Sequence, residues 1–279
     1  MTDWRLGIDL GTSAIKLVVL DASGEVKAES GASHPTVSKS PGQAEQDPQD
    51  WLRALRQAIA ALPAGSKEKI GAISVAGQMP TLVCLDASGD CIGPAITWQD
   101  SRADGMAAEK LQGGLHARVY ARTGMPVDGR YLAPQFLHHF QDRRADVRRI
   151  LSAKDYIVYA LTGRGVTDPS TAAGYGVYAL ETEAWDAGLC AIWDLPVALL
   201  PDLLPTTAVA GEVTATAAAD FGLPAGVPVH AGAGASAARA LPAEGVERNR
   251  PSVALGPRAT AFGMDGRWTC SPRVSALPG

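Results

Sequence analysis

The sequence predicts an α/β fold in which helices pack on a mixed β-sheet. Three short apolar segments follow one another through tight polar turns between residues 6 and 31, which is typical of an antiparallel meander. An amphipathic segment begins at Asp47 and ends near Leu62, and an apolar, β-branched segment follows at residues 70–76. Strands and helices that alternate in this order form a layered α/β domain.

The meander strands are expected at residues 6–10, 14–20 and 25–31, because each apolar segment is bounded by turn residues. Asp47 suits the N-cap of the first helix and Pro48 suits its first turn. Inside that helix four large apolar residues recur at helical spacing: Trp51, Leu55, Ile59 and Leu62. Residues 70–76 are expected to be a buried strand, and a later strand is expected near residues 227–231.

The middle of the chain, residues 102–204, alternates helical stretches with Pro and Gly breaks and is expected to be an insertion on the sheet. A short connection rich in Glu, Arg and Pro at residues 242–251 precedes a strand-turn-strand pattern at 252–264. We therefore expect one domain over residues 1–241, and the incomplete beginning of a second domain over residues 242–279.

Composition narrows the classes of protein to which the chain can belong. Its 279 residues are 46% hydrophobic and 19% charged, which is typical of a soluble globular protein and excludes a disordered tail. A net charge of −4 without basic blocks argues against nucleic acid and membrane partners. The first residues lack a signal-peptide pattern, so a cytoplasmic location with four reduced cysteines is expected. The spacing of the histidines and cysteines argues against a metal site built from them.

The segment from Gly7 to Ser13 reads Gly-Ile-Asp-Leu-Gly-Thr-Ser and is followed by another strand. A turn of this kind directs backbone N–H groups and two hydroxyls toward a small concavity that suits phosphate oxygens. Asp9 can hold Mg²⁺ beside it, because Mg²⁺ needs only one or two carboxylates together with phosphate oxygens and water. The same residues also fit an ordinary hairpin turn with an incidental acid.

The segment from Gly232 to Ala237 matches the G-x-G-x-x-A pattern of dinucleotide-binding turns. An acidic residue is expected about 20 residues further on in such a site, but Pro251, Ser252 and Val253 occupy that stretch. The favoured interpretation is a tight strand-to-helix turn in which small residues permit close packing. An NAD-dependent oxidoreductase is the alternative that this motif leaves open.

Several motifs occur in one order along the chain, although each is short and unspecific by itself. The set consists of Gly7 to Ser13, Glu45-Gln46-Asp47-Pro48 with Trp51, Gly77-Gln78-Met79, Leu85-Asp86, Pro94 to Asp100 with Arg102, Lys154-Asp155-Tyr156 with Leu161-Thr162-Gly163, Thr167-Asp168, and Pro228 to Ala238. As an ordered set it resembles the FGGY carbohydrate kinases, and most of all their xylulokinase branch. The resemblance runs from Arg5 to about Trp268.

The resemblance implies an actin-like ATPase fold, in which two RNase H-like domains enclose a cleft with the sugar mainly on the first and ATP mainly on the second. It also implies transfer of phosphate from Mg-ATP to a sugar or polyol hydroxyl, a reaction that depends on positioning and charge stabilisation. By this similarity Asp9 positions Mg²⁺, through water, and the transferring phosphoryl group. The residues expected at the phosphates are Gly11, Thr12, Ser13 and Lys16, and those expected at the sugar are Gln78, Met79, Trp98, Asp100 and Ser236.

The chain departs from the family pattern at the position of the catalytic base. The family carries Asp followed by Asn where this chain has Ala235 and Ser236. A methyl group cannot accept the proton of the attacking hydroxyl, and general-base catalysis typically contributes ~10²–10⁴-fold.

Three other departures affect the same cleft. The second phosphate loop keeps Gly256 but has Pro257 after it, which removes a backbone N–H donor. Pro80 and Thr81 stand where xylulokinases carry His and Gly, and the chain stops at the start of the expected ATP-binding half. We therefore expect a sugar-kinase homologue with weak or no kinase activity as this chain. The alternative is a non-catalytic sugar-binding or regulatory module that pairs with a second subunit or with its own missing domain.

Overall fold

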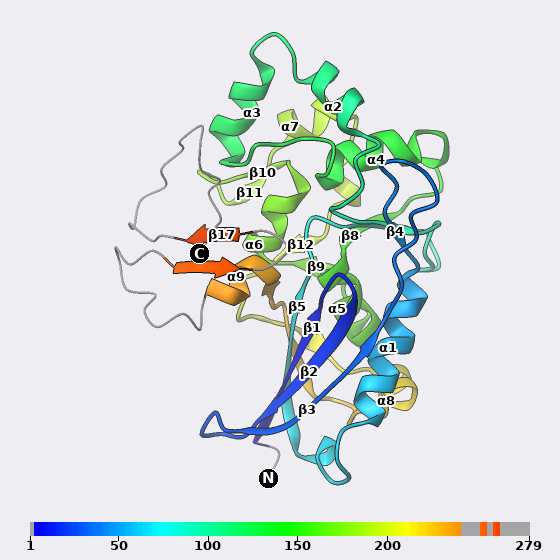
Figure 1. Cartoon of the computed structure of the whole chain (residues 1–279), viewed down its shortest axis with the longest axis vertical. Coiled ribbons are helices and arrows are strands. Elements are labelled where there is room, and N and C mark those ends of the chain that lie inside the picture. The colour runs from blue at the N-terminus through cyan, green and yellow to red at the C-terminus, as the bar shows by residue number, and fades with distance from the viewer. Residues whose placement is uncertain (1–2, 241–251, 256–258, 263–279) are drawn as a thin grey trace.

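A seven-stranded mixed sheet is the central feature of the computed structural model, which describes residues 3–240, 252–255 and 259–262 (Figure 1). Its strands are β1 (Trp4–Leu10), β2 (Ala14–Leu20), β3 (Val26–Ser33), β5 (Ile70–Gly77), β13 (Val209–Glu212), β14 (Pro228–His230) and β15 (Ala233–Gly234). The order across the sheet is β13-β14-β5-β1-β2-β3, and β15 also pairs with β5. β1, β2 and β3 form the predicted antiparallel meander, while β1 and β5 are parallel. The mixed sheet and the meander are thus confirmed.

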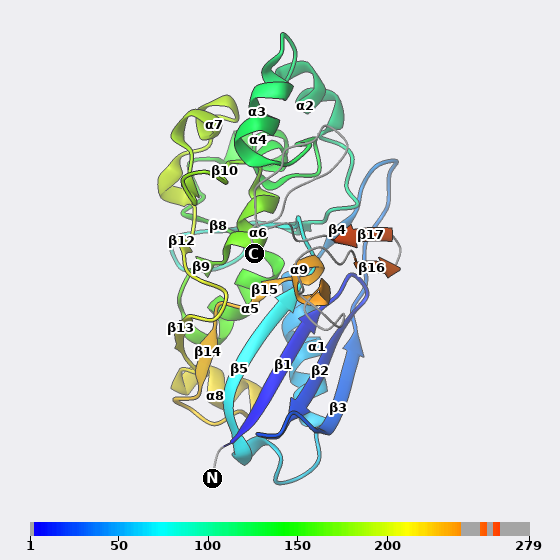
Figure 2. The same cartoon turned by 90° about the vertical axis from the view of Figure 1, so that its left-hand side faces the viewer.

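Three helices cover one face of this sheet: α1 (Pro48–Ala60), α5 (Ala153–Thr162) and α8 (Ala215–Phe221). Alternate residues of β1 and β2 point toward them, because side chains of a strand alternate between its two faces. Leu6, Ile8, Leu10, Ile15, Leu17 and Val19 are accordingly buried. Figure 2 shows the opposite face of β5, β1, β2 and β3 turned to the viewer, with α1 behind the sheet.

A helical lobe with its own hydrophobic core stands beyond one end of the sheet (Figure 1). Its core contains the buried side chains of Phe136, Tyr175 and Trp193. Its helices are α2 (Asp104–Lys110), α3 (Leu115–Thr123), α4 (Leu132–Phe140) and α7 (Ala187–Ile192), whereas α6 (Pro169–Ala172) lies against β15 of the main sheet. A small sheet of order β4-β7-β6-β8 lies between this lobe and the main sheet, and is formed by β4 (Glu45–Gln46), β6 (Leu82–Leu85), β7 (Ala95–Ile96) and β8 (Arg149–Ser152).

Short elements complete both the lobe and the part of the chain around the main sheet. Two further strand pairs are β9 (Val166–Thr167) with β12 (Asp202–Leu203), and β10 (Tyr178–Ala179) with β11 (Ala184–Trp185). The 3₁₀ turns are η1 (Lys67–Lys69), η2 (Gln141–Arg143), η3 (Ala173–Tyr175) and η4 (Val197–Leu199). The structure corrects one expectation here, because α5 lies inside the expected insertion but packs on the main sheet. Its buried apolar residues, such as Ile157 and Leu161, belong to the sheet core.

The C-terminal part that the structure describes consists of α9 (Ala235–Ala240) and an antiparallel hairpin of β16 (Ser252–Leu255) and β17 (Ala259–Phe262). The hairpin agrees with the strand-turn-strand pattern expected there. The division into residues 1–241 and 242–279 stays a prediction.

Three cysteines, Cys84, Cys91 and Cys190, lie in the described ranges and are free thiols. Burial raises the pKa of Cys84 well above its ordinary value and raises the pKa values of Cys91 and Cys190 to about 11. These thiols therefore stay protonated near neutral pH. Within residues 3–240 and the hairpin, no helix has the length and apolar character needed to cross a membrane.

Candidate functional site

Three parallel strands end side by side at one edge of the main sheet. In the register of the sheet Leu10 of β1 lies beside Gly77 of β5, and Gly77 lies beside Gly234 of β15. The residues that follow these strands are Gly11, Gln78 and Ala235. The carboxyl edge of parallel strands is where α/β proteins bind their ligands. The edge thus brings the expected phosphate turn, the expected sugar residue and the expected base position together.

Asp9 stands in β1, next to Lys16 of β2 on one side and Ala76 of β5 on the other. Directly opposite residues of neighbouring strands point to the same face of a sheet. Asp9 Oδ1 is buried and accepts no hydrogen bond from the described residues, while Lys16 is exposed. A carboxylate oxygen without a donor suits a cation or a water bound to one.

The donor set around Asp9 fits Mg²⁺ better than a metal held entirely by protein. The described residues contain no group of three His, Cys, Asp or Glu side chains placed to hold a metal ion. Mg²⁺ is usually held by one or two carboxylates and completes its shell with phosphate oxygens and water. Asp9 would supply the carboxylate, and the metal would supply charge neutralisation for a phosphate.

The turn from Gly11 to Ser13 is fixed by its neighbours. The Gly11 N–H donates to the Ala14 carbonyl at 2.9 Å, and the His34 N–H donates to the Ser13 carbonyl at 3.0 Å. Thr12 is held on the side of the expected sugar residues, because its hydroxyl accepts from Trp98 Nε1 at 3.2 Å and its carbonyl accepts from Gln46 Nε2 at 2.7 Å. Ser13 is exposed. Of the two hydroxyls in this turn, the Ser13 hydroxyl is the more accessible to a ligand.

Gln46 links the phosphate turn to Gln78. Its carbonyl oxygen accepts from Trp51 Nε1 at 2.9 Å and from Gln78 Nε2 at 2.7 Å. Its amide nitrogen donates to the Thr12 carbonyl and to Thr36 Oγ1, the latter at 2.6 Å. Sequence reasoning assigned Gln46 no role at the site. Its place directly before an amphipathic helix was the only signal in the sequence, and three of its four partners are far from it along the chain.

Met79 packs against two glycines that are far apart in the sequence, Gly234 and Gly174. A Cβ atom added to Gly234 would lie 2.2 Å from Met79 Sδ, and one added to Gly174 would lie 3.1 Å from Met79 Cε. Gly232 has a φ of +74°, and a Cβ atom there would lie 1.9 Å from the Val75 carbonyl oxygen. The glycines of this turn are therefore required by close packing, as the favoured interpretation of the G-x-G-x-x-A match expected.

The expected base position begins α9. Ala235 and Ser236 are partly buried, and Ala235 carries no atom that can accept a proton. The preceding Gly234 N–H donates to Ser170 Oγ at 3.0 Å, which attaches the turn to the start of α6. Gly256, the remaining residue expected at the phosphates, lies outside the described residues.

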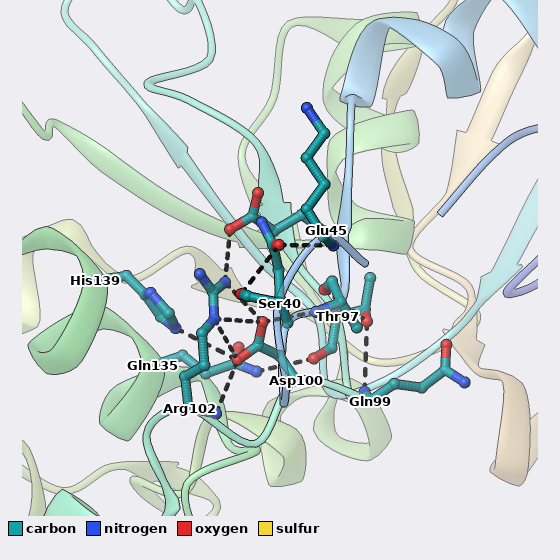
Figure 3. Close-up of polar contacts among 11 residues, drawn as sticks. Ser40, Glu45, Thr97, Gln99, Asp100, Arg102, Gln135 and His139 are labelled. Atoms are coloured by element: carbon teal, nitrogen blue, oxygen red, sulfur yellow. Dashed lines mark hydrogen bonds and ion pairs between the residues drawn. The ribbon is translucent and has the colours of Figure 1, made fainter. Parts of the chain in front are cut away.

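Asp100 lies deeper than a direct sugar contact requires. Its side chain is 1% exposed, and it accepts hydrogen bonds from the Ala44 N–H at 2.9 Å and from the Arg102 guanidinium at 2.7 Å (Figure 3). Arg102 also bonds Glu45 Oε1 at 2.6 Å, and His139 Nε2 lies 3.7 Å from the carboxylate. Figure 3 shows Arg102 between the two carboxylates. Asp100 thus holds β4, which carries Gln46, against the segment that carries Trp98.

The electrostatic balance at Asp100 favours its charged form. Burial by itself raises the pKa of the Asp100 carboxyl, but His139, Arg102 and the backbone N–H groups lower it by more. The pKa of Asp100 is therefore well below its ordinary value. A role for Asp100 in sugar binding stays a prediction, and its geometry directs that prediction toward positioning.

A buried charged cluster around Lys154 contacts the segment that precedes α9. Lys154 is fully buried, with its ammonium 2.7 Å from Asp155 Oδ1, 3.1 Å from Asp168 Oδ1 and 2.7 Å from the Ala231 carbonyl. Burial lowers the pKa of Lys154, but the two carboxylates outweigh it and raise the pKa above its ordinary value. The charged lysine therefore ties α5, α6 and the β14–β15 turn together. The sequence motifs contained these residues without indicating that they meet.

A surface depression of about 470 Å³ lies between α3 and α7, in the helical lobe. Its lining includes Leu115, Arg122 and Asp186, and the last two form an ion pair. It contains none of the residues expected at the phosphates or the sugar. We assign the candidate site to the strand edge because the unpartnered oxygens of Asp9 and Gln78 lie there, whereas the polar groups Arg122 and Asp186 of the depression pair with each other.

Comparison with known proteins decides the family. Residues 4–241 match the model of the N-terminal domain of the FGGY family of carbohydrate kinases. The chain belongs to this family. It is 35% identical over 274 residues to a xylulose kinase of Streptomyces coelicolor, an alignment that covers 96% of the chain and 55% of that protein. A glycerol kinase of Gloeobacter violaceus is 30% identical over 212 residues, or 74% of the chain and 43% of that protein.

A solved structure extends the comparison to three dimensions. The crystal structure of xylulose kinase from Rhodospirillum rubrum superposes with a TM-score of 0.92 and 29% identity, covering 98% of the chain and 57% of that protein. The FGGY carbohydrate kinase chain thus has the actin-like ATPase fold that the resemblance implied. It spans about half of the length of the relatives it matches.

Proposed function

We propose that this FGGY chain binds a sugar or polyol of the kind that xylulose kinases phosphorylate, and that it transfers phosphate from Mg-ATP weakly or not at all. The observation that carries the proposal is the row Gly11, Gln78 and Ala235 at the carboxyl edge of β1, β5 and β15. It supports binding because the sugar residue Gln78 lies between the phosphate turn and the position from which a base would act. It supports weak transfer because that position is alanine. We place this activity in the cytoplasm.

The size of the proposed loss of phosphate-transfer activity follows from the missing base. A general base typically accelerates a reaction ~10²–10⁴-fold, and Ala235 removes that contribution while leaving Asp9, the phosphate turn and the sugar residues in place. Positioning and charge stabilisation supply most of the catalysis in phosphoryl transfer, so a small residual turnover is compatible with the proposal.

The test separates binding from transfer. Calorimetry with a panel of pentuloses, pentitols and glycerol measures binding, and a coupled ADP assay with Mg-ATP measures transfer. We expect binding of at least one ligand and turnover near background, and at least a tenfold rise in turnover for Ala235→Asp when a second, ATP-binding domain is supplied. Ala238→Asp is the matched control, because it adds a carboxylate elsewhere on α9 and is expected to change nothing. Turnover by the unaltered chain at the rate of ordinary sugar kinases would overturn the weak-transfer part.

A second candidate function is a non-catalytic binding module that pairs with another chain. The observation that favours it is the face of β1, β2 and β5 opposite α1, which no described helix covers apart from α9 at one end of β5 (Figure 2). Residues 7, 72 and 76 on this face are Gly, Ala and Ala, which permit close approach of a partner. Light scattering at high protein concentration tests it, and a strict monomer counts against it.

A further inference from the structure

The orientation of the Gln46 side-chain amide is determined by two partners that each have one possible role. An indole N–H can only donate, so the Gln46 atom 2.9 Å from Trp51 Nε1 is the carbonyl oxygen. A backbone carbonyl can only accept, so the Gln46 atom 2.7 Å from the Thr12 oxygen is the amide nitrogen. Both partners give the same orientation. Gln46 is 0% exposed, so water does not compete with either bond.

The orientation of the Gln46 amide determines that of the Gln78 amide. The Gln46 carbonyl oxygen lies 2.7 Å from the Gln78 side-chain amide, so the Gln78 atom at this contact is the nitrogen. The other branch of that amide, Gln78 Oε1, is buried and receives no hydrogen bond from any described residue. Rotating the Gln78 amide alone would place its carbonyl oxygen against the carbonyl oxygen of Gln46, and neither atom can donate. Rotating both amides would place the Gln46 NH₂ group against the Trp51 N–H and the Gln46 carbonyl oxygen against the Thr12 carbonyl, so both partners of Gln46 disfavour it.

We propose that Trp51 and Gln46 are positioning residues that hold Gln78 as a hydrogen-bond acceptor, and that Gln78 Oε1 accepts from a hydroxyl of the bound ligand. The ligand in this statement rests on the proposed function, whereas the fixed polarity rests on the hydrogen bonds alone. A hydroxyl satisfies the buried oxygen because it can donate. A keto, ether or fluoro group at the same place cannot donate and is rejected. The substrate class is therefore one with a free hydroxyl at this position.

Ligand analogues test the acceptor role. For a sugar or polyol that binds the chain, each hydroxyl in turn is replaced by fluorine, and dissociation constants are measured by calorimetry. We expect one replacement to weaken binding to the unaltered chain about tenfold or more, because Gln78 Oε1 is then left unpaired. In Trp51→Phe the Gln46 amide loses one of its two orienting partners and keeps the Thr12 carbonyl, so the two amides rotate more readily and we expect that ratio to fall clearly below its value in the unaltered chain. An unchanged ratio would contradict the proposal.

Trp193→Phe is the matched control. Trp193 is 0% exposed, like Trp51, but its Nε1 donates to no group in the part of the chain that the structure describes. The substitution therefore removes a buried indole without removing a hydrogen bond to an amide. We expect the ratio for the fluorinated analogue to stay as in the unaltered chain.

A second measurement needs no ligand and no Trp51 variant. In the chain labelled with ¹⁵N-glutamine, Gln78→Glu assigns the Gln78 side-chain NH₂ signal. We expect its protons to exchange with solvent more slowly than those of the exposed Gln112, because Gln46 accepts from Gln78. We call the hydrogen bonds from Trp51 through Gln46 to Gln78 the relay. Exchange as fast as that of Gln112 would overturn it. If Trp51→Phe folds, it should accelerate Gln78 exchange, whereas Trp193→Phe should not.

The outcomes distinguish this proposal from the proposed function. A protected Gln78 amide together with a fluorine-sensitive hydroxyl supports both parts of the inference. A protected amide with no sensitive hydroxyl overturns the ligand contact and leaves the relay. If no sugar or polyol binds at all, the proposed function and the ligand contact both fail, and the exchange measurement still decides the relay.

Discussion

At the scale of single residues, the turn before α9 depends on the absence of a side chain at Gly232. Its φ of +74° favours glycine, and the Val75 backbone lies where a Cβ atom would be. The backbone of β5 cannot move away without breaking its pairing with β1. Close packing at this residue therefore sets the position of Gly234 and, after it, of the expected base position.

We expect Gly232→Ala to lower the free energy of unfolding by about 3 kcal/mol or more, because it combines backbone strain with a backbone clash. Gly24→Ala is the control, since Gly24 has a φ of +87° and no atom lies within 4 Å of an added Cβ. The strain alone should cost about 1 kcal/mol. Urea unfolding at pH 7 measures both, and equal losses would show that the Val75 contact has no role.

The residues of the candidate site were predictable where they adjoin strand ends, and not where they meet through space. Asp9, Gly11 and Gln78 follow or end apolar strands, so their placement at a sheet edge could be expected from the sequence. Gln46 could not, because its four hydrogen bonds join it to residues in four separate segments. Lys154 is similar, since its charge is compensated by its neighbour Asp155 and by Asp168, the N-cap of α6.

At the scale of elements, the N-terminus of α1 positions the segment that carries Gln46. Asp47 is the N-cap and accepts from the Gln49 N–H at 2.8 Å, and Pro48 follows at the first helical position. This capping arrangement was expected from the sequence and is confirmed. It fixes where β4 ends and the helix begins, and so it fixes the direction in which Trp51 enters the core.

We expect Asp47→Ala to lower the free energy of unfolding by about 1 kcal/mol, because an N-terminal N–H of the helix loses its acceptor. Asp47→Asn should cost less than half as much, since its amide oxygen can still cap the helix. Thermal or urea unfolding compares the two variants. If both lost the same stability, the charge of Asp47 and not the cap would be the stabilising feature.

Long elements were predicted more closely than short ones. β1, β2, β5 and α1 repeat their apolar residues over two or more periods, and the structure places them within a few residues of the predicted ranges. The third strand was expected at residues 25–31 and runs from Val26 to Ser33. Strands such as β4 and β7 contain two residues each. So short a segment shows no periodicity, and its pairing is determined by the tertiary fold.

At the scale of the whole molecule, the Asp100 cluster connects the small sheet, through β4, to the helical lobe, through α4. His139 belongs to α4, and Glu45 and Gln46 form β4. The charge on Asp100 therefore affects how the two hydrophobic cores are joined as well as the local loop. Its protonation should be visible in the stability of the entire described fold.

The contribution of Asp100 to the stability of the fold depends on pH in a definite direction. The folded-state pKa of Asp100 lies below the ordinary value of about 3.9, so folding favours the ionised carboxylate. Its contribution is complete above the ordinary pKa and is lost as the pH falls from there toward the folded-state pKa. We expect Asp100→Asn to lower the free energy of unfolding at pH 7 by about 2 kcal/mol. Between pH 7 and pH 3 the stability of this variant should decrease less than that of the unaltered chain.

Urea unfolding at several pH values checks this, with the exposed Asp142→Asn as the control. That substitution should leave the stability at pH 7 within about 0.5 kcal/mol of the unaltered chain. A parallel decrease for the unaltered chain and Asp100→Asn would show that other carboxylates cause the acid sensitivity.

The row of Leu10, Gly77 and Gly234 has a consequence for the order of folding. Most of the described chain separates the first of these residues from the last. The meander joins neighbours in sequence and can form early, whereas β15 can pair with β5 only after a long loop has closed. Hairpin and helix signals should therefore recover first on refolding. Recovery of ligand binding then reports the docking of β15, the step that completes the edge.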